Sequence, residues 1–278
     1  MGNSHHSLSN SNSSNTDFSF SQRTELDPNK VNFDHDVIFP ILAIGDSICK
    51  GCYRSNMGTN SEIRFHPFSV ALTTLINEKF KTLPKCKVYE FGRVEETTFS
   101  LTQRLLRFLQ LQNIYEDQCL HSRQGYDNIP EGYMHYRYRT IETIVNTIKD
   151  MSEQCLQQPS VSWVAICSIP SSKKDVNMNI LSKKVETNEM IQHHVNEFNS
   201  MLNRKNSKRL IYVDITTPFY YLSSTPQDIQ KYWSDDLLFT PEGYDKIAEI
   251  IFHSLQSHFS QHLSGTQSFF TLNEYDNK

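Results

Sequence analysis

An apolar run followed by a polar turn decides the predicted fold: Ile41-Leu42-Ala43-Ile44-Gly45-Asp46-Ser47-Ile48-Cys49-Lys50-Gly51. The apolar residues predict a buried strand, and Gly-Asp-Ser predicts a turn where that strand ends. A turn at the carboxyl edge of an open α/β sheet presents its side chains where such sheets bind ligands. Ser47 is therefore a candidate nucleophile, provided that a general base lies near it.

The chain on either side alternates short apolar runs with amphipathic stretches, a pattern typical of βαβ units around a buried parallel sheet. Strands are predicted at 38–44, 87–91, 162–169 and 210–215, and helices at 67–81, 99–111, 136–154, 184–203 and 241–262. Residues 115–131 are polar and rich in turn formers, and no strand is predicted there. The pattern predicts an α/β sandwich.

Two further motifs adjoin predicted strands and helices. The strand at 87–91 ends at Gly92, whose amide could join that of Ser47 in an oxyanion hole. The last helix follows Ser234-Asp235-Asp236-Leu237-Leu238-Phe239-Thr240-Pro241-Glu242-Gly243-Tyr244. Thr240 suits the N-cap position and Pro241 the first helical position.

The order and separation of these blocks resemble the SGNH (GDSL-type) ester hydrolases, over residues from about 38 to 262. The resemblance implies a three-layer α/β/α sandwich with a mostly parallel, flavodoxin-like sheet. It also implies Ser47 as nucleophile and Asp235 as the triad aspartate, with an oxyanion hole formed by Ser47, Gly92 and Asn128. Asn128 is the weakest match, because Gly125-Tyr126-Asp127-Asn128 exchanges the last two residues of the family's Gly-x-Asn-Asp turn.

The same register places Leu238 where the family has its general-base histidine. Leucine can neither take the serine proton nor deliver one to a leaving group. Since general acid–base catalysis contributes roughly 10²–10⁴-fold, a conventional esterase rate is not expected without another base. His66, at the start of the first helix, is the candidate substitute base, with a structural or substrate-contact role as the alternative. His193 and His194 are predicted on an exposed helix side, and His253 as partly exposed.

Cys49-Lys50-Gly51-Cys52 has the spacing of zinc knuckles and redox motifs. A second pair of ligands at matching distance is missing from the sequence, so small half-buried thiols are the favoured interpretation and no metal or cofactor is predicted. The six cysteines, irregularly spaced, are expected to be reduced rather than to form a disulfide framework.

The composition limits which partners and which cellular location are expected. A net charge of −4, with scattered Lys and Arg, argues against a nucleic-acid partner, and no apolar run is long enough to span a membrane. A cytoplasmic location is expected, with Gly2 as an incomplete match to an N-myristoylation signal. Residues 1–34 are expected to be a disordered Ser/Asn-rich tail, 35–263 the domain and 264–278 a second tail.

Two functions are consistent with these observations. The first is hydrolysis of a carboxylic ester of a small alcohol, sugar or lipid, impaired by the loss of the histidine. The second is a catalytically inactive family member that binds a ligand or a protein partner in the same crevice. Leu238 favours the second function, whereas the retained Ser47 and Asp235 favour the first. The sequence does not name the substrate or the oligomeric state.

Overall fold

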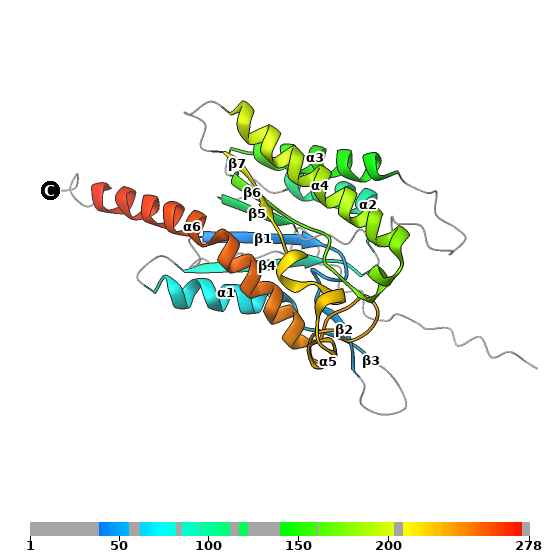
Figure 1. The fold of residues 1–278 in the computed structure, drawn as a ribbon. Coiled ribbons are helices and arrows are strands. Elements are labelled where there is room, and N and C mark those ends of the chain that lie inside the picture. The colour runs from blue at the N-terminus through cyan, green and yellow to red at the C-terminus, as the bar shows by residue number, and fades with distance from the viewer. Residues whose placement is uncertain are drawn as a thin grey trace, which may run out of the picture.

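The central sheet is built from five parallel strands (Figure 1). The computed structural model describes residues 39–55, 62–81, 85–94, 96–111, 117–121, 140–159, 161–202 and 208–273. The strand order is β4-β1-β5-β6-β7, which is the flavodoxin-like order. The strands are β1 (Phe39–Gly45), β4 (Cys86–Gly92), β5 (Asp117–His121), β6 (Val161–Cys167) and β7 (Arg209–Val213).

Helices cover both faces of the sheet, so the predicted three-layer α/β/α sandwich is confirmed (Figure 1). One face carries α1 (Phe68–Lys79) and α6 (Pro241–Asn273). The other carries α2 (Thr98–Leu111), α3 (Ile141–Gln157) and α4 (Met178–Met201). The short helix α5 (Pro226–Tyr232) precedes the segment that leads into α6.

Strand β1 is apolar along its length because both of its faces are covered. Ile41 and Ala43 belong to the core cluster that includes residues of α1 and α6. Leu42 and Ile44 belong to the cluster that includes residues of α2, α3 and α4. Successive strand side chains point to opposite faces, so a strand with helices on both sides needs a continuous apolar run.

The fold contains a strand that the sequence did not predict. Strand β5 lies between β1 and β6, within the polar stretch where no strand was predicted. The prediction was wrong because ladder hydrogen bonds are made by the backbone, so two neighbouring parallel strands can hold a segment of weak strand propensity. A second unpredicted feature is the antiparallel hairpin of β2 (Cys52–Ser55) and β3 (Glu62–Phe65), which follows the Ser47 turn.

Several helix ends differ from their predicted positions. Helix α4 begins at Met178 rather than at 184, since the Asn177 side chain accepts the Asn179 amide as an N-cap. Helix α6 continues to Asn273 instead of ending at 262. The predicted Thr240 cap is confirmed, because its hydroxyl accepts the Gly243 amide at 3.1 Å.

Residues 1–34 lie outside the described residues, and the division into a domain and two tails stays a prediction.

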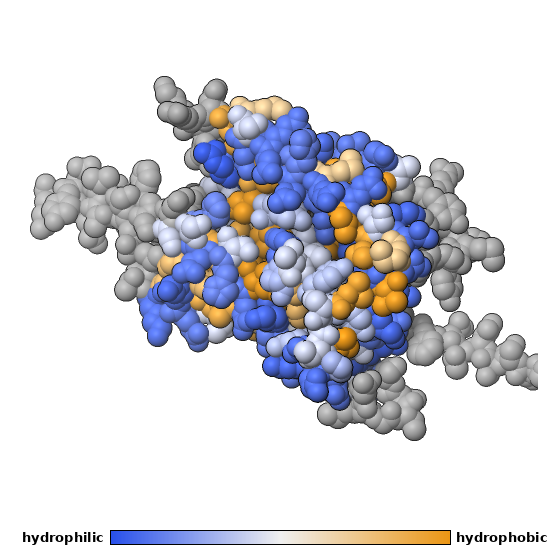
Figure 2. Space-filling model, viewed as in Figure 1, coloured by the Kyte–Doolittle hydropathy of each residue, from blue (hydrophilic) through white to orange (hydrophobic). Residues whose placement is uncertain are grey.

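In the described ranges, no helix combines the length and hydropathy that a membrane span needs. The face of the molecule seen in Figure 2 is mostly hydrophilic, with hydrophobic residues in small patches. Within the same ranges, no group of three or more His, Cys, Asp and Glu side chains is arranged to hold a metal ion.

Candidate functional site at the carboxyl edge of the sheet

Hydrogen bonds between residues of the Ser47 turn fix its conformation. The Cys52 amide donates to the Ser47 carbonyl at 2.9 Å, and Asp46 Oδ1 accepts the Ile48 amide at 2.9 Å. Gly51 has φ of +73°, and a Cβ there would lie 2.3 Å from the His66 carbonyl carbon. The turn follows β1, which lies between β4 and β5, the point where flavodoxin-like sheets bind ligands. Ser47 itself is 8% exposed.

Gly92 packs directly on this turn, at the end of the neighbouring strand. A Cβ at Gly92 would lie 2.2 Å from the Lys50 backbone nitrogen, so only glycine allows the approach. The Gly92 amide donates to the Glu90 carboxylate, which also forms an ion pair of 3.1 Å with Lys50. Burial raises the pKa of Glu90, while Lys50 and the Gly92 amide oppose that shift. An oxyanion role for Gly92 stays a prediction, and it would require Glu90 to release this amide.

Asp235 is held by its own turn and by one arginine. Its Oδ1 accepts the amides of Leu237 at 2.8 Å and Leu238 at 2.7 Å. Its Oδ2 accepts Arg54 Nε at 3.1 Å, with side-chain exposures of 51% for Arg54 and 25% for Asp235. In a catalytic triad the aspartate would accept an imidazole N–H. Here a guanidinium, which does not lose its proton in proteins, makes that contact.

The Ser47 turn and the Asp235 segment lie at the same edge of the sheet. The Tyr244 hydroxyl, from the first turn of α6, donates to the Cys52 carbonyl at 2.6 Å. Burial raises the pKa of Tyr244 well above its ordinary value, with further contributions from Cys52, Asp46 and Asp235. Carboxylates from both motifs, Asp46 and Asp235, therefore lie near one buried tyrosine.

His66 belongs to this edge and pairs with a carboxylate of α6. Its Nε2 lies 2.8 Å from Asp245 Oδ1, and its backbone amide donates to the Gly51 carbonyl at 2.7 Å. A role as substitute base stays a prediction. We call Ser47, Arg54, His66, Asp235 and Asp245 the edge site.

The other histidine predictions have mixed outcomes. His193 and His253 are exposed. His194 was predicted on the exposed side of its helix, and this is wrong, because it is 5% exposed and packs beside Phe198. Asn128 and Gly2 lie outside the described residues, so a third oxyanion donor and N-myristoylation both stay predictions.

The cysteine pair beside Ser47 consists of two buried thiols that form no disulfide. The Cys49 thiol donates to the Ala43 carbonyl at 3.2 Å. Burial, with a further contribution from Asp46, raises the pKa of Cys52 to about 12. Since the thiolate is the reactive form, this environment suits packing rather than redox chemistry.

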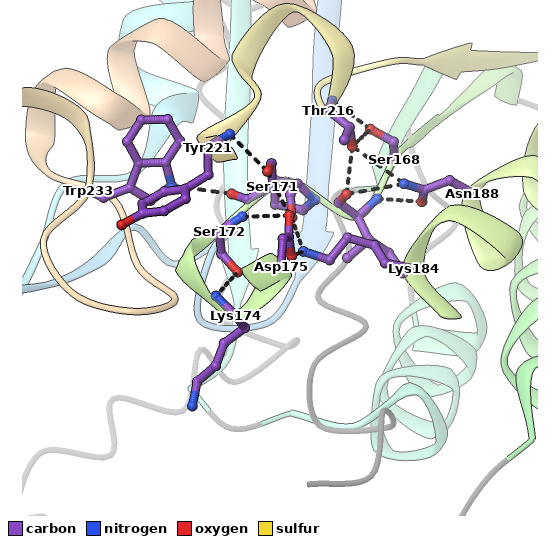
Figure 3. A network of polar contacts seen from close by, with 12 residues as sticks. Ser168, Ser171, Ser172, Lys174, Asp175, Lys184, Asn188, Thr216, Tyr221 and Trp233 are labelled. Atoms are coloured by element: carbon purple, nitrogen blue, oxygen red, sulfur yellow. Dashed lines mark hydrogen bonds and ion pairs between the residues drawn. The ribbon is translucent and has the colours of Figure 1, made fainter. Parts of the chain in front are cut away.

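A polar network that the sequence did not predict follows β6 (Figure 3). Asp175 and Lys184 form an ion pair whose side chains are 0% and 1% exposed. The Ser171 hydroxyl donates to Asp175 Oδ2 at 2.6 Å, and Lys184 Nζ donates to a backbone carbonyl of the same loop at 2.9 Å. Asn188 Oδ1 accepts the Ile169 amide at 2.8 Å. We call Ser171, Asp175, Lys184 and Asn188 the β6 network.

The β6 network supports the segment that contains Asp235. Trp233 Nε1 donates to the Ser171 carbonyl at 3.2 Å, and Lys173 Nζ donates to Asp236 Oδ1 at 2.8 Å (Figure 3 shows the Trp233 contact). Trp233 and Asp236, on either side of Ser234 and Asp235, are thus bonded to the loop after β6. A lysine within a helical pattern gave no signal of this burial, because charged residues usually lie at the surface.

Comparisons with known proteins bear on the fold of the chain. Neither a protein-family model nor a curated protein sequence matches the chain. Among solved structures, a GDSL-like lipase from Parabacteroides merdae, described as putative, aligns with a TM-score of 0.60 and 17% identity, covering 81% of this chain and 98% of that one.

Two further solved structures are similar. A lipase/acylhydrolase from Enterococcus faecalis aligns with a TM-score of 0.56 and 16% identity over 80% of this chain and 97% of its own. A catalytic mutant of an acetylxylan esterase from Geobacillus stearothermophilus aligns with a TM-score of 0.56 and 13% identity, covering 80% of this chain and 96% of its own. At these identities the likeness is one of fold. The strand order, the layers and these neighbours together show that the chain has the SGNH hydrolase fold.

Proposed function

We propose that the chain is an SGNH-type hydrolase in which ester turnover is impaired and the edge site mainly binds a ligand. The observation that carries this proposal is the environment of Asp235. Its two carboxylate oxygens accept Arg54 Nε and the amides of Leu237 and Leu238. The register of the family motif puts Leu238 at the position of its histidine, and Arg54 Nε contacts the carboxylate oxygen that an imidazole would need.

A second candidate is a slow ester hydrolase that uses His66 as its base. The specific observation in its favour is the contact of 2.8 Å between His66 Nε2 and Asp245 Oδ1. A carboxylate that accepts the N–H of one ring nitrogen fixes the tautomer, which leaves the other ring nitrogen as a proton acceptor. The substrate of this second candidate would be a carboxylic ester of a small alcohol, sugar or lipid.

One experiment separates the two candidates. The purified chain, with Ser47→Ala, Leu238→His and His66→Gln variants, is incubated with p-nitrophenyl acetate and with a serine-directed fluorophosphonate. The proposal predicts little turnover by the wild type and a gain in Leu238→His that depends on Ser47. Slow wild-type turnover that both Ser47→Ala and His66→Gln abolish would favour the second candidate. Wild-type turnover at an ordinary esterase rate would contradict the proposed impairment.

A further inference from the structure

The face of the β2–β3 hairpin beside the Ser47 turn combines a cation with apolar side chains. Cys52 is opposite Phe65 and Arg54 is opposite Ile63 in the antiparallel register. Opposite residues, and residues two apart along a strand, share one face. Arg54, Ile63 and Phe65 therefore lie on the same face, while Tyr53 belongs to the opposite face and packs against the core.

The apolar side chains on this face are exposed. Ile63 is 41% exposed and Phe65 is 52% exposed. The Lys50 ammonium lies 5.9 Å from the centre of the Phe65 ring, so the apolar pair borders the turn that contains Ser47. Strand geometry places Phe65 about 7 Å from Ile63 along β3. The two side chains offer a short apolar track that leads from the Ser47 turn toward Arg54.

Arg54 is fixed at one end and free at the other. Asp235 accepts only its Nε, and among the described residues no acceptor contacts its Nη1 or Nη2. The Asp235 carboxylate is itself held by two backbone amides, so the guanidinium is oriented before any ligand arrives. A guanidinium presents its N–H groups in a planar fork that matches the two oxygens of a carboxylate.

We infer that this hairpin face binds a ligand that joins a carboxylate to an apolar chain. The carboxylate accepts the Nη1 and Nη2 hydrogens of Arg54, and the chain lies along Ile63 and Phe65. A neutral ester lacks the charge that Arg54 recognises, so the inference concerns a different ligand class from the esters of the fold's hydrolases. It rests on the proposed function because it names the ligand for the same edge site.

Calorimetric titration with decanoate, kept below its micelle concentration, tests the inference against two partial ligands. Decanol has the chain without the charge, and acetate has the charge without the chain. We expect decanoate to bind more tightly than either. Arg54→Gln should weaken decanoate binding about tenfold to a hundredfold, the range for hydrogen bonds to charged groups, and leave decanol binding unchanged. Phe65→Ser should weaken the binding of decanoate and decanol alike.

Arg64→Gln is the matched control, since Arg64 lies on the same hairpin but opposite Tyr53, on the other face. It should leave decanoate affinity unchanged. The inference is overturned if decanoate fails to bind, if decanol binds equally well, or if Arg54→Gln binds decanoate like the wild type. Binding of phosphatidylserine vesicles in place of decanoate would overturn it in favour of a membrane surface.

The ester assay on the same preparations keeps the two proposals distinct. If Leu238→His gains turnover while Arg54→Gln leaves decanoate affinity unchanged, the inference fails and the proposed function stands. If decanoate binding follows Arg54 and the wild type is an efficient esterase, the proposed impairment fails and the binding inference stands.

Discussion

The edge site and the β6 network are both polar clusters near the carboxyl edge of the sheet, yet they differ in burial. In the β6 network the charged pair is at most 1% exposed, and its oxygens and ammonium have partners within the loop after β6 and α4. In the edge site Arg54 and His66 have side chains that are 51% and 38% exposed. A buried ion pair is costly to break from one side, whereas the exposed Arg54 guanidinium is accessible to a ligand.

The largest expected effect is on the stability provided by the β6 network. Lys184→Met should lower the free energy of unfolding by about 3–5 kcal/mol, because Asp175 is left buried and unpaired. Urea denaturation followed by circular dichroism measures this change. Lys184→Met combined with Asp175→Leu should recover much of the loss, since no unpaired charge then remains.

The exposed pair of Lys173 and Asp236 provides the control for this prediction. Its side chains are 58% and 51% exposed, so Lys173→Met should leave the unfolding midpoint nearly unchanged. If the Lys184 and Lys173 variants lose the same stability, burial does not set the cost of breaking an ion pair and the comparison fails.

A smaller effect is expected on catalysis at the edge site. In Leu238→His the new imidazole must compete with Arg54 for Asp235 Oδ2. Leu238→His combined with Arg54→Gln should therefore exceed Leu238→His alone in kcat/KM for p-nitrophenyl acetate. The gain over the wild type should approach a hundredfold, about the low end of general-base catalysis.

Leu238→His combined with Arg64→Gln is the matched control, because Arg64 pairs with Glu62 and makes no described contact with Asp235. This variant should behave like Leu238→His alone. Equal activity of the Arg54 and Arg64 double variants would show that Arg54 does not compete for the aspartate.

The third prediction concerns the backbone beneath the edge site. Gly92→Ala should cost about 1–3 kcal/mol, since its Cβ would lie 2.2 Å from the Lys50 nitrogen and the Ser47 turn would have to move. The variant should also lose whatever fluorophosphonate labelling of Ser47 the wild type shows. Thermal unfolding and gel fluorescence measure the two effects. Wild-type stability with unchanged labelling would mean that the close approach does not position the turn.

Most of the fold could be predicted because its signal is local. The run from Ile41 to Gly45 is apolar and ends in a turn. At the start of α6, the Thr240 hydroxyl accepts a backbone amide and Pro241 occupies the first helical position. Strand β5 could not be predicted, because its strand state depends on the backbones of β1 and β6 rather than on its own residues.

The candidate site likewise contains some residues that the sequence predicted and others that it did not. Ser47, Gly92 and Asp235 were found from short motifs, and the structure brings all three to one edge of the sheet. Arg54 was missed because its partner lies 181 positions away, and no spacing in the sequence joins them. Asp175 and Lys184 were missed because their burial comes from packing between the loop after β6 and α4, which the helical pattern does not specify.

The smallest expected effect compares two buried polar residues of α4. Asn188 makes hydrogen bonds to the Ile169 backbone, whereas His194 Nε2 has no hydrogen-bond partner among the described residues. Burial lowers the pKa of His194, Lys149 and His193 lower it further, and Glu197 opposes them. The unfolded chain thus binds a proton more readily than the folded one. Stability should therefore fall as the pH drops from about 6.5 through the lowered pKa, by at most about 1.4 kcal/mol per pH unit.

His194→Leu should remove this part of the acid sensitivity, and the exposed neighbour offers the control His193→Leu, which should keep it. Urea midpoints at pH 7.5 and pH 5 measure the difference for each variant. The reasoning requires His194 to stay neutral in the folded state while it is protonated in the unfolded state. If His194→Leu loses as much stability at pH 5 as the wild type does, the unpaired imidazole is not the source. Protonation of the His194 imidazole would then make no measurable contribution to the loss of folding free energy at pH 5.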